Sequence, residues 1–116
     1  MPNEVVISEN FKREAKKFLK KYASLKSELA ELAQELKDNP KLGTQILENA
    51  YKIRLACKSK GKGKSGGFRI ITYLEEIEED EVDILITLLS IYDKSETDTI
   101  SNSQIKAIIE SLDDEK

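Results

Sequence analysis

The sequence predicts an α+β domain with the element order β-α-α-β-β-β-α. Three observations lead to this prediction. Apolar residues recur at helical spacing through the first third of the chain, alternate with polar residues from Tyr51 onward, and return to helical spacing near the end. We therefore expect a small antiparallel sheet with an N-terminal helical hairpin on one face and a C-terminal helix.

The N-terminal third predicts a strand followed by two helices. Val5-Val6-Ile7 is a short β-branched run, and Ser8 is a suitable cap for the helix after it. A break at Ala23-Ser24 separates this helix from a second one, which Asn39-Pro40 ends because the residue before proline avoids the α region. The two apolar stripes consist of Phe11, Ala15, Phe18, Leu19 and Tyr22, and of Leu25, Leu29, Leu32, Ala33 and Leu36.

The middle of the chain predicts three strands. Residues 40–49 are expected to form a loop, after which residues 51–58 alternate between apolar and basic side chains. The glycine- and lysine-rich segment 59–67 predicts a mobile loop. A strand over 68–74, an acidic turn over 75–81 and a strand over 82–92 follow. The last of these is apolar on both faces, which indicates a central position covered on both sides.

The C-terminal segment predicts a polar loop and a closing helix. Ser101 and Gln104 fit a capping box before an apolar stripe, and the acidic tail from Asp113 to Lys116 is expected to be frayed. Because the connections between the last three strands are short, these strands should form an antiparallel meander. The stripe of the closing helix consists of Ile105, Ile108, Ile109 and Leu112.

Length and composition limit the class of protein. A chain of 116 residues is expected to form a single domain over residues 1–116, and 39% apolar with 35% charged residues is typical of a globular protein. The sequence contains no histidine and one cysteine, Cys57. Histidine-based ribonuclease chemistry, Ser/His or Cys/His triads and cysteine-cluster metal sites are therefore excluded. Cys57 lies in the apolar register of its strand and is expected in the core.

The sequence predicts a cytoplasmic protein without a membrane partner. The start from Met1 to Glu4 has no positive region followed by an apolar stretch, so it does not resemble a signal peptide. No window approaches the roughly 20 apolar residues that a membrane helix needs.

Charge is sharply segregated along the chain, although the net charge is −3. No acidic residue occurs from Asn49 to Leu74, whereas acids occupy positions 75, 76, 78, 79, 80, 81 and 83. A basic hairpin in an acidic protein indicates a phosphate-binding surface. Solvated lysines are the alternative. The glycine-lysine loop lacks Walker spacing, and the acidic turn favours a solvated hairpin tip over a metal site, so no cofactor and no metal are expected.

Strand alternation predicts where the basic groups lie. Lys52, Arg54 and Lys58 share one face of their strand. Arg69, Ile71 and Tyr73 share a face of the next strand, and Tyr92 and Lys94 share a face at the end of the third. If the apolar sides pack on the helices, the basic side is open to solvent and forms a floor for a phosphate chain and stacked bases.

The central hairpin resembles the RelE/ParE toxin superfamily, and its RelE and HigB-like branches most. The resemblance rests on Lys-Ile-Arg at 52–54, Gly-Lys-Ser-Gly-Gly-Phe-Arg at 63–69 and Ile-Tyr-Asp-Lys-Ser-Glu at 91–96. The helical hairpin before these motifs and the helix after them fit the order of elements in that superfamily. The resemblance therefore covers nearly the whole chain.

The resemblance implies a toxin that cleaves mRNA in the ribosomal A site without a metal and is neutralised by a cognate antitoxin. In such ribonucleases the 2′-hydroxyl attacks the adjacent phosphate, and lysine, arginine and tyrosine replace histidine. Lysine and arginine can perform this chemistry. Neighbouring cations lower the pKa of a lysine, so that it can act as a base near neutral pH, and arginine stabilises the charge of the phosphorane. The implied partners are the antitoxin, mRNA and the ribosome.

Carried over to this chain, the resemblance implies three catalytic residues. Arg69 would stabilise the phosphate, and Tyr92 and Lys94 would orient or protonate leaving groups. One lysine would act as base, and the residues that bind the RNA backbone would be Lys52, Arg54, Lys58, Lys60, Lys62 and Lys64. Two structural alternatives stay open: Tyr92 packed on the closing helix, and Arg69 in an ion pair with Glu75 or another acid of the adjacent turn.

Two other functions remain open. A ParE-like relative would bind DNA gyrase without nuclease chemistry, and a non-catalytic module would bind RNA in a salt-dependent manner. The chain departs from the best-known nucleases of the family, because Lys94 and Lys106 are the only basic residues between Glu75 and Asp114. In the toxin interpretations, the amphipathic helix over 105–112 is a candidate surface for the antitoxin.

Overall fold

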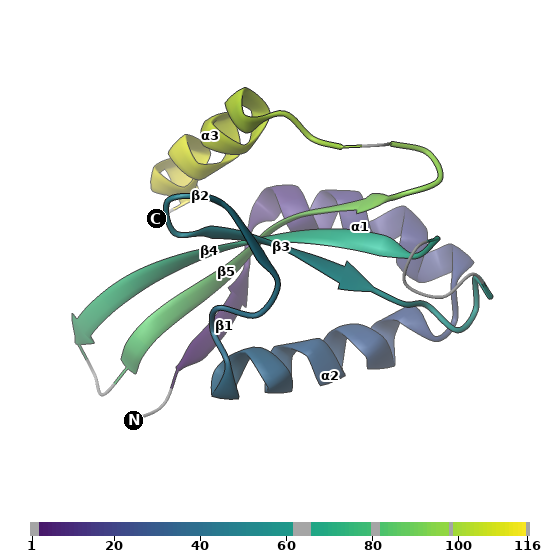
Figure 1. The fold of residues 1–116 in the computed structure, drawn as a ribbon, viewed down its shortest axis with the longest axis horizontal. Helices are drawn as coiled ribbons and strands as arrows, with labels where there is room; N and C mark the ends of the chain where they lie inside the picture. Colours follow the sequence, from purple (N-terminus) through teal and green to yellow (C-terminus); the bar gives the residue numbers. More distant parts are fainter. Residues whose placement is uncertain (1–2, 62–65, 80–81, 98, 116) are drawn as a thin grey trace.

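The computed structural model describes residues 3–61, 66–79, 82–97 and 99–115. Figure 1 shows the arrangement of the elements within these ranges. In chain order they are β1 (Glu4–Ile7), α1 (Glu9–Lys21), α2 (Leu25–Asp38), β2 (Thr44–Leu47), β3 (Ala50–Leu55), β4 (Phe68–Glu79), β5 (Val82–Asp93), α3 (Asn102–Ser111) and the 3-10 helix η1 (Leu112–Glu115).

The strands form one five-stranded sheet with the order β1-β5-β4-β3-β2. The predicted antiparallel meander is confirmed, because β3 pairs with β4 and β4 pairs with β5 in antiparallel register. β1 is the exception to an antiparallel sheet, since it pairs in parallel with β5. Two helices and three strands lie between β1 and β5 along the chain, which leaves ample length for a parallel crossover.

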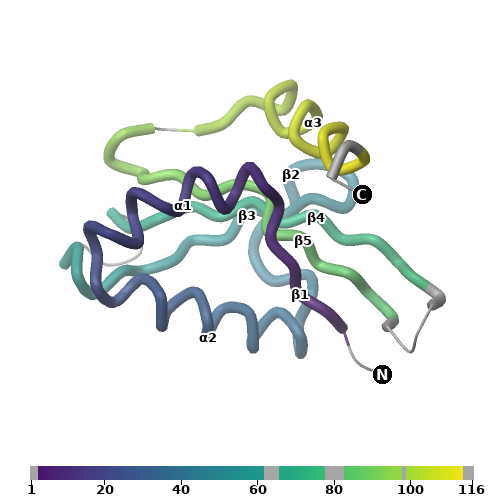
Figure 2. Tube along the Cα trace, turned by 180° about the vertical axis from the view of Figure 1, so that it is seen from behind, coloured from purple at the N-terminus to yellow at the C-terminus, as the bar shows by residue number. Residues whose placement is uncertain are grey.

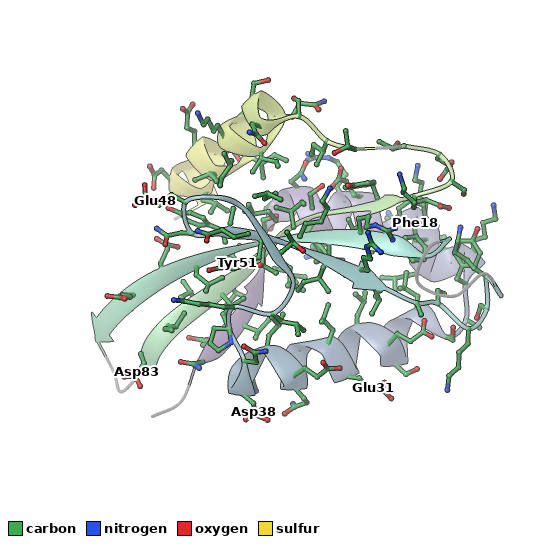
Figure 3. All side chains as sticks on the ribbon, in the orientation of Figure 1. Phe18, Glu31, Asp38, Glu48, Tyr51 and Asp83 are labelled. Carbon is green, nitrogen blue, oxygen red and sulfur yellow. The ribbon has the colours of Figure 1, made fainter. Side chains whose placement is uncertain are left out.

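The sheet is covered on both faces. Figures 1 and 2 show α3 on one side of the sheet and α2 on the other. The larger apolar cluster joins the helical hairpin to the sheet, and Figure 3 shows the side chains that fill the layer between the sheet and α2. The smaller cluster joins Ile105 of α3 to Ile71 and Leu89 of the sheet. The predicted helical hairpin on one face and the central position of β5 are both confirmed.

The helix ends follow the predicted capping residues. The Ser8 hydroxyl accepts a hydrogen bond from the Phe11 N–H at 2.9 Å, and α2 ends before Asn39, whose N–H donates to the Glu35 carbonyl. Ser101 and Gln104 form the reciprocal capping box of α3. These local hydrogen bonds satisfy N–H and C=O groups that a helix terminus leaves without a partner.

The expectation of a loop over residues 40–49 is wrong, because this segment contains β2. Gly43 has φ +98°, and a Cβ atom there would overlap the Lys52 carbonyl oxygen. Only glycine therefore allows the backbone to approach β3 at this point. Asn49, with φ +65°, completes the two-residue turn that reverses the chain between Leu47 and Ala50.

The acidic segment and the tail also differ from expectation. β4 continues through Glu79 instead of ending at Leu74, with Glu75 opposite Leu85 and Glu76 opposite Ile84 of β5. The acidic residues of β4 continue to pair with apolar residues of β5. Charged side chains are compatible with a strand wherever one face of the sheet is open to water. The tail forms η1 through Glu115 rather than fraying.

Candidate nucleic-acid interface

Three of the predicted site residues form a row across the sheet. Arg69 of β4 lies opposite Arg54 of β3 and opposite Tyr92 of β5. Directly opposed residues of antiparallel strands place their side chains on the same face. The two arginines place two guanidinium groups in directly opposed positions, and a guanidinium binds anions such as phosphate through paired N–H donors. This row is therefore a candidate anion site.

A cleft of about 850 Å³ adjoins this row and separates β3 from α2. Its lining has a basic side and an acidic side. The acidic side consists of Glu28, Glu31 and Glu35 of α2, and the basic side of Lys52, Arg54, Lys58, Arg69 and Lys94. Five of the predicted site residues therefore meet at one cleft. A bound polyanion would be attracted to the sheet side and repelled from the helix side.

Arg69 lies at the bottom of this arrangement. Its exposed fraction is 5%, and its Nη1 donates a hydrogen bond to the Phe68 carbonyl at 3.3 Å. The alternative of an ion pair with Glu75 is contradicted by the extended conformation of β4. Six residues of strand separate the two Cα atoms by about 20 Å, which exceeds the reach of the side chains. The other predicted acids of the turn lie still farther along the strand.

Tyr92 is covered by α3. It packs in the same apolar cluster as Ile71, Leu89 and Ile105, and its exposed fraction is 7%. Its hydroxyl is buried and has no hydrogen-bond partner within the described part of the chain. Tyr92 thus packs on the closing helix α3, which was the structural alternative to a catalytic role for this residue. The expectation that the basic face of the sheet is fully open to solvent is wrong at this end, because Ile105 of α3 packs against the apolar side chains on that face.

The apolar side of α3 is not a free surface. Ile108, Ile109 and Leu112 pack against the same sheet cluster as Ile105. The prediction that the segment 105–112 offers an exposed apolar face to an antitoxin is therefore wrong for this conformation. The amphipathic pattern of this helix is explained by its contact with the sheet.

Lys60 occupies a site that the sequence analysis did not expect. Its Nζ lies 2.8 Å from Asp93 Oδ1 and 2.7 Å from Asp93 Oδ2, in an ion pair whose side chains are 5% and 4% exposed. The ammonium also lies over the rings of Tyr22 and Phe68. Lys60 therefore anchors the start of the segment 59–67, so the alternative of a solvated lysine is wrong for this residue. The contact with the RNA backbone that the resemblance implied for Lys60 stays a prediction, and it would require this ion pair to open. Lys62 and Lys64 lie outside the described residues.

The ends of the basic hairpin are held by further hydrogen bonds. The Lys58 N–H donates to Glu28 Oε2 at 2.8 Å, and the Ser59 N–H donates to the Ser24 hydroxyl at 3.0 Å. The Lys94 N–H donates to the Gly67 carbonyl at 3.1 Å. Sequence analysis missed Glu28 and Asp93, because their partners are 30 and 33 residues away. Cys57 is buried in the core beside this hairpin, as predicted.

The described residues hold no cluster of three or more His, Cys, Asp or Glu side chains that is suited to a metal ion. Within the same ranges, each helix is too short or too polar to cross a membrane.

Comparison with known proteins identifies the fold. No protein-family model matches the sequence. A free-state structure of a doubly substituted variant of the Escherichia coli toxin RelE is similar, with a TM-score of 0.54 and 17% sequence identity, over 84% of this chain and 90% of that chain. That similarity agrees with the α+β order and the mostly antiparallel sheet. The chain therefore has a RelE-like fold.

Proposed function

We propose that this protein is the toxin of a toxin-antitoxin system and cleaves mRNA on the ribosome without a metal ion. The observation that carries the proposal is the position of Arg69, between Arg54 and Tyr92 and in the lining of a cleft with a basic side. The similarity in fold to a protein described as a toxin supports the same proposal.

The proposed reaction is an internal phosphoryl transfer. A lysine of the cleft takes the proton of an RNA 2′-hydroxyl, whose oxygen then bonds to the adjacent phosphorus. The bond from phosphorus to the 5′-oxygen breaks, leaving a 2′,3′-cyclic phosphate and a 5′-hydroxyl. Arg69 stabilises the charge of the phosphorane, since a guanidinium stays protonated and binds two oxygens at once. Arg54, Lys52 and Lys58 hold the flanking phosphates.

Lys94 and Tyr92 have different access to the leaving group. Lys94 is half-buried and lines the cleft, so it is the residue that we propose as proton donor. The Tyr92 hydroxyl is enclosed beneath α3, so its proposed role is to orient the scissile group, and contact with RNA requires α3 to move. The ribosome supplies much of the positioning of the mRNA, and a cognate antitoxin blocks access in the resting cell.

Induction of the chain alone in a bacterial host tests the proposal. The parent is compared with an Arg69→Ala/Tyr92→Phe double variant and with Lys26→Ala, an exposed position on α2 outside the cleft lining. Cuts in translated mRNA are mapped by primer extension. Growth arrest with new cuts in the parent and the Lys26 variant, both absent from the double variant, is expected. Arrest with intact mRNA would instead indicate a gyrase-type target, and absence of arrest a non-toxic binding module.

A further inference from the structure

We propose that the exposed face of α1 is a second RNA-binding surface, which holds the phosphate backbone of the same single strand where that strand leaves the basic cleft. The proposal rests on the proposed function, because it assumes that RNA occupies the cleft between β3 and α2. It assigns a ligand to a group of cations that the proposed cleavage reaction does not use.

The cations of α1 form two parallel rows. All are exposed, while Phe11, Ala15 and Phe18 turn the opposite side of the helix into the core. Neighbours within a row are four residues apart, which corresponds to about 6 Å along the helix axis. The rows therefore offer regularly spaced point charges to a chain of phosphates. One row consists of Lys12, Lys16 and Lys20, and the other of Arg13, Lys17 and Lys21.

The helix itself offsets this positive charge only in part, because α1 carries two carboxylates, Glu9 in its first turn and Glu14, against six cations. The Glu14 carboxylate faces the sheet, where its Oε1 accepts hydrogen bonds from Asn10 Nδ2 and Ser90 Oγ, both at 2.8 Å, and from the Ile91 N–H at 3.3 Å. Within the described ranges, none of the six cations forms an ion pair with a carboxylate. Like charges four residues apart repel and destabilise a helix. An external polyanion would relieve this repulsion.

The face of α1 lies next to the proposed cleavage site. A second cleft, of about 580 Å³, separates α1 from the end of β5. Tyr92 and Asp93 line this second cleft, whereas Lys94 lines the basic cleft. Asp93 and Lys94 are consecutive, with Cα atoms about 3.8 Å apart, so the linings of the two clefts meet at the end of β5. The residues of α1 that border the second cleft are Arg13, Glu14, Lys16, Lys17, Phe18 and Lys20.

The chemistry of this face favours a phosphate backbone over bases. Lysine presents a flexible point charge, which suits phosphate contacts that carry no sequence information. The ammonium of Lys17 lies over the ring of Phe18, whose exposed fraction is 5%, so this ring is not available for stacking with a base. The exposed Leu19 belongs to a separate groove beside β1. Binding at α1 is thus expected to depend on salt and on RNA length, but not on sequence.

Fluorescence anisotropy with uncleavable 2′-O-methyl oligouridylates of 4 and 16 nucleotides tests the inference. The parent is compared with a Lys16→Gln/Lys17→Gln/Lys20→Gln variant and with a Lys26→Gln/Lys37→Gln/Lys41→Gln control, whose three lysines are exposed and lie outside α1. Three lost phosphate contacts should reduce the slope of log affinity against log salt by about 2 for the 16-nucleotide RNA. Its affinity should fall about 10-fold or more at low salt, with the 4-nucleotide RNA and the control unaffected.

The inference would be overturned by equal salt slopes for the two RNA lengths in the parent, or by an unchanged affinity of the α1 variant for the 16-nucleotide RNA. A 16-base-pair duplex RNA is measured in parallel. A loss of affinity in the α1 variant that is confined to this duplex would also overturn the inference. The last result would assign α1 to a separate structured RNA. Thermal unfolding should show that the α1 variant is folded, because its substitutions remove like-charge repulsion. A parent that binds long RNA through α1 but cuts no mRNA would refute the proposed function and leave this inference standing.

Discussion

Lys60 and Asp93 form a buried ion pair in which one ammonium contacts both carboxylate oxygens, at 2.8 and 2.7 Å. The Asp93 carboxylate also accepts hydrogen bonds from the N–H and the hydroxyl of Ser95, at 2.9 and 2.7 Å. This pair joins the turn after β3 to the end of β5. Asp93 lies between Tyr92 and Lys94 in sequence, so the ion pair holds the end of β5, on which the proposed chemistry depends.

Replacement of Lys60 by methionine should lower the free energy of unfolding by about 3 kcal/mol, because it leaves the Asp93 charge buried without its main partner. Urea denaturation measures this change. The matched control is Lys58→Met, two residues earlier, whose side chain is exposed and whose effect should stay within about 0.5 kcal/mol. Equal effects of the two substitutions would contradict a special role for the ion pair.

The contribution of this pair should depend on pH in a defined way. Burial raises the pKa of Asp93, but hydrogen bonds from Lys60 and Ser95 outweigh it and hold the pKa below 3.8. Burial likewise lowers the pKa of Lys60, but the hydrogen bond and charge of Asp93 raise it above 10.5. The carboxylate therefore adds stability above its unfolded pKa and loses it as pH falls, whereas the ammonium adds stability below its unfolded pKa and loses it as pH rises.

The difference in unfolding free energy between the parent and Lys60→Met should thus be constant from about pH 5 to 9 and shrink on both sides. Denaturation series at constant ionic strength measure it. A difference that grows as the pH falls below 4 would contradict the assigned direction of the Asp93 shift.

Tyr92→Phe should separate the structural role of the side chain from a chemical one. The buried hydroxyl has no hydrogen-bond partner among the described residues. Its removal should leave stability unchanged or raise it by up to about 1 kcal/mol. If the hydroxyl orients the scissile group, the rate of RNA cleavage should nevertheless fall about 100-fold. Tyr73→Phe, at a tyrosine that packs in the same sheet cluster, is the control and should retain cleavage. Full activity in both variants would make Tyr92 a core residue alone.

Gly43→Ala should destabilise the protein more than Gly61→Ala does. Both glycines have positive φ, at +98° and +72°, which alone costs an alanine about 1 kcal/mol. At Gly43 the added methyl would also meet the Lys52 carbonyl oxygen, whereas at Gly61 no atom of the described residues beyond its chain neighbours lies within 4 Å of it. We expect a loss of about 3 kcal/mol for Gly43→Ala. Because Gly43 also lines the basic cleft, the RNA affinity of the Gly43→Ala variant should fall. Similar losses at both positions would show that β2 does not depend on this contact.

The elements of this protein could be predicted because they depend on local patterns. The Ser8 cap, the break before Leu25 and the capping box at Ser101 involve residues within a few positions of one another. Strand alternation likewise placed Arg69 and Tyr73 on one face of β4. The segment 44–47 was missed because its pairing with β3 depends on a glycine contact rather than on its own hydrophobic pattern.

The sequence by itself determined the order of the three α-helices and of every strand except β2, the basic character of the central hairpin and the exclusion of histidine chemistry, because composition and periodicity are properties of neighbouring residues. Only the tertiary structure decided that Arg54, Arg69 and Tyr92 stand in one row, because strand register depends on contacts between distant segments. It also decided that α3 covers Tyr92 and that Lys60 is buried on Asp93. Burial is set by what packs from elsewhere in the chain, so a lysine of a glycine-rich segment and a tyrosine at a strand end gave no local indication of it.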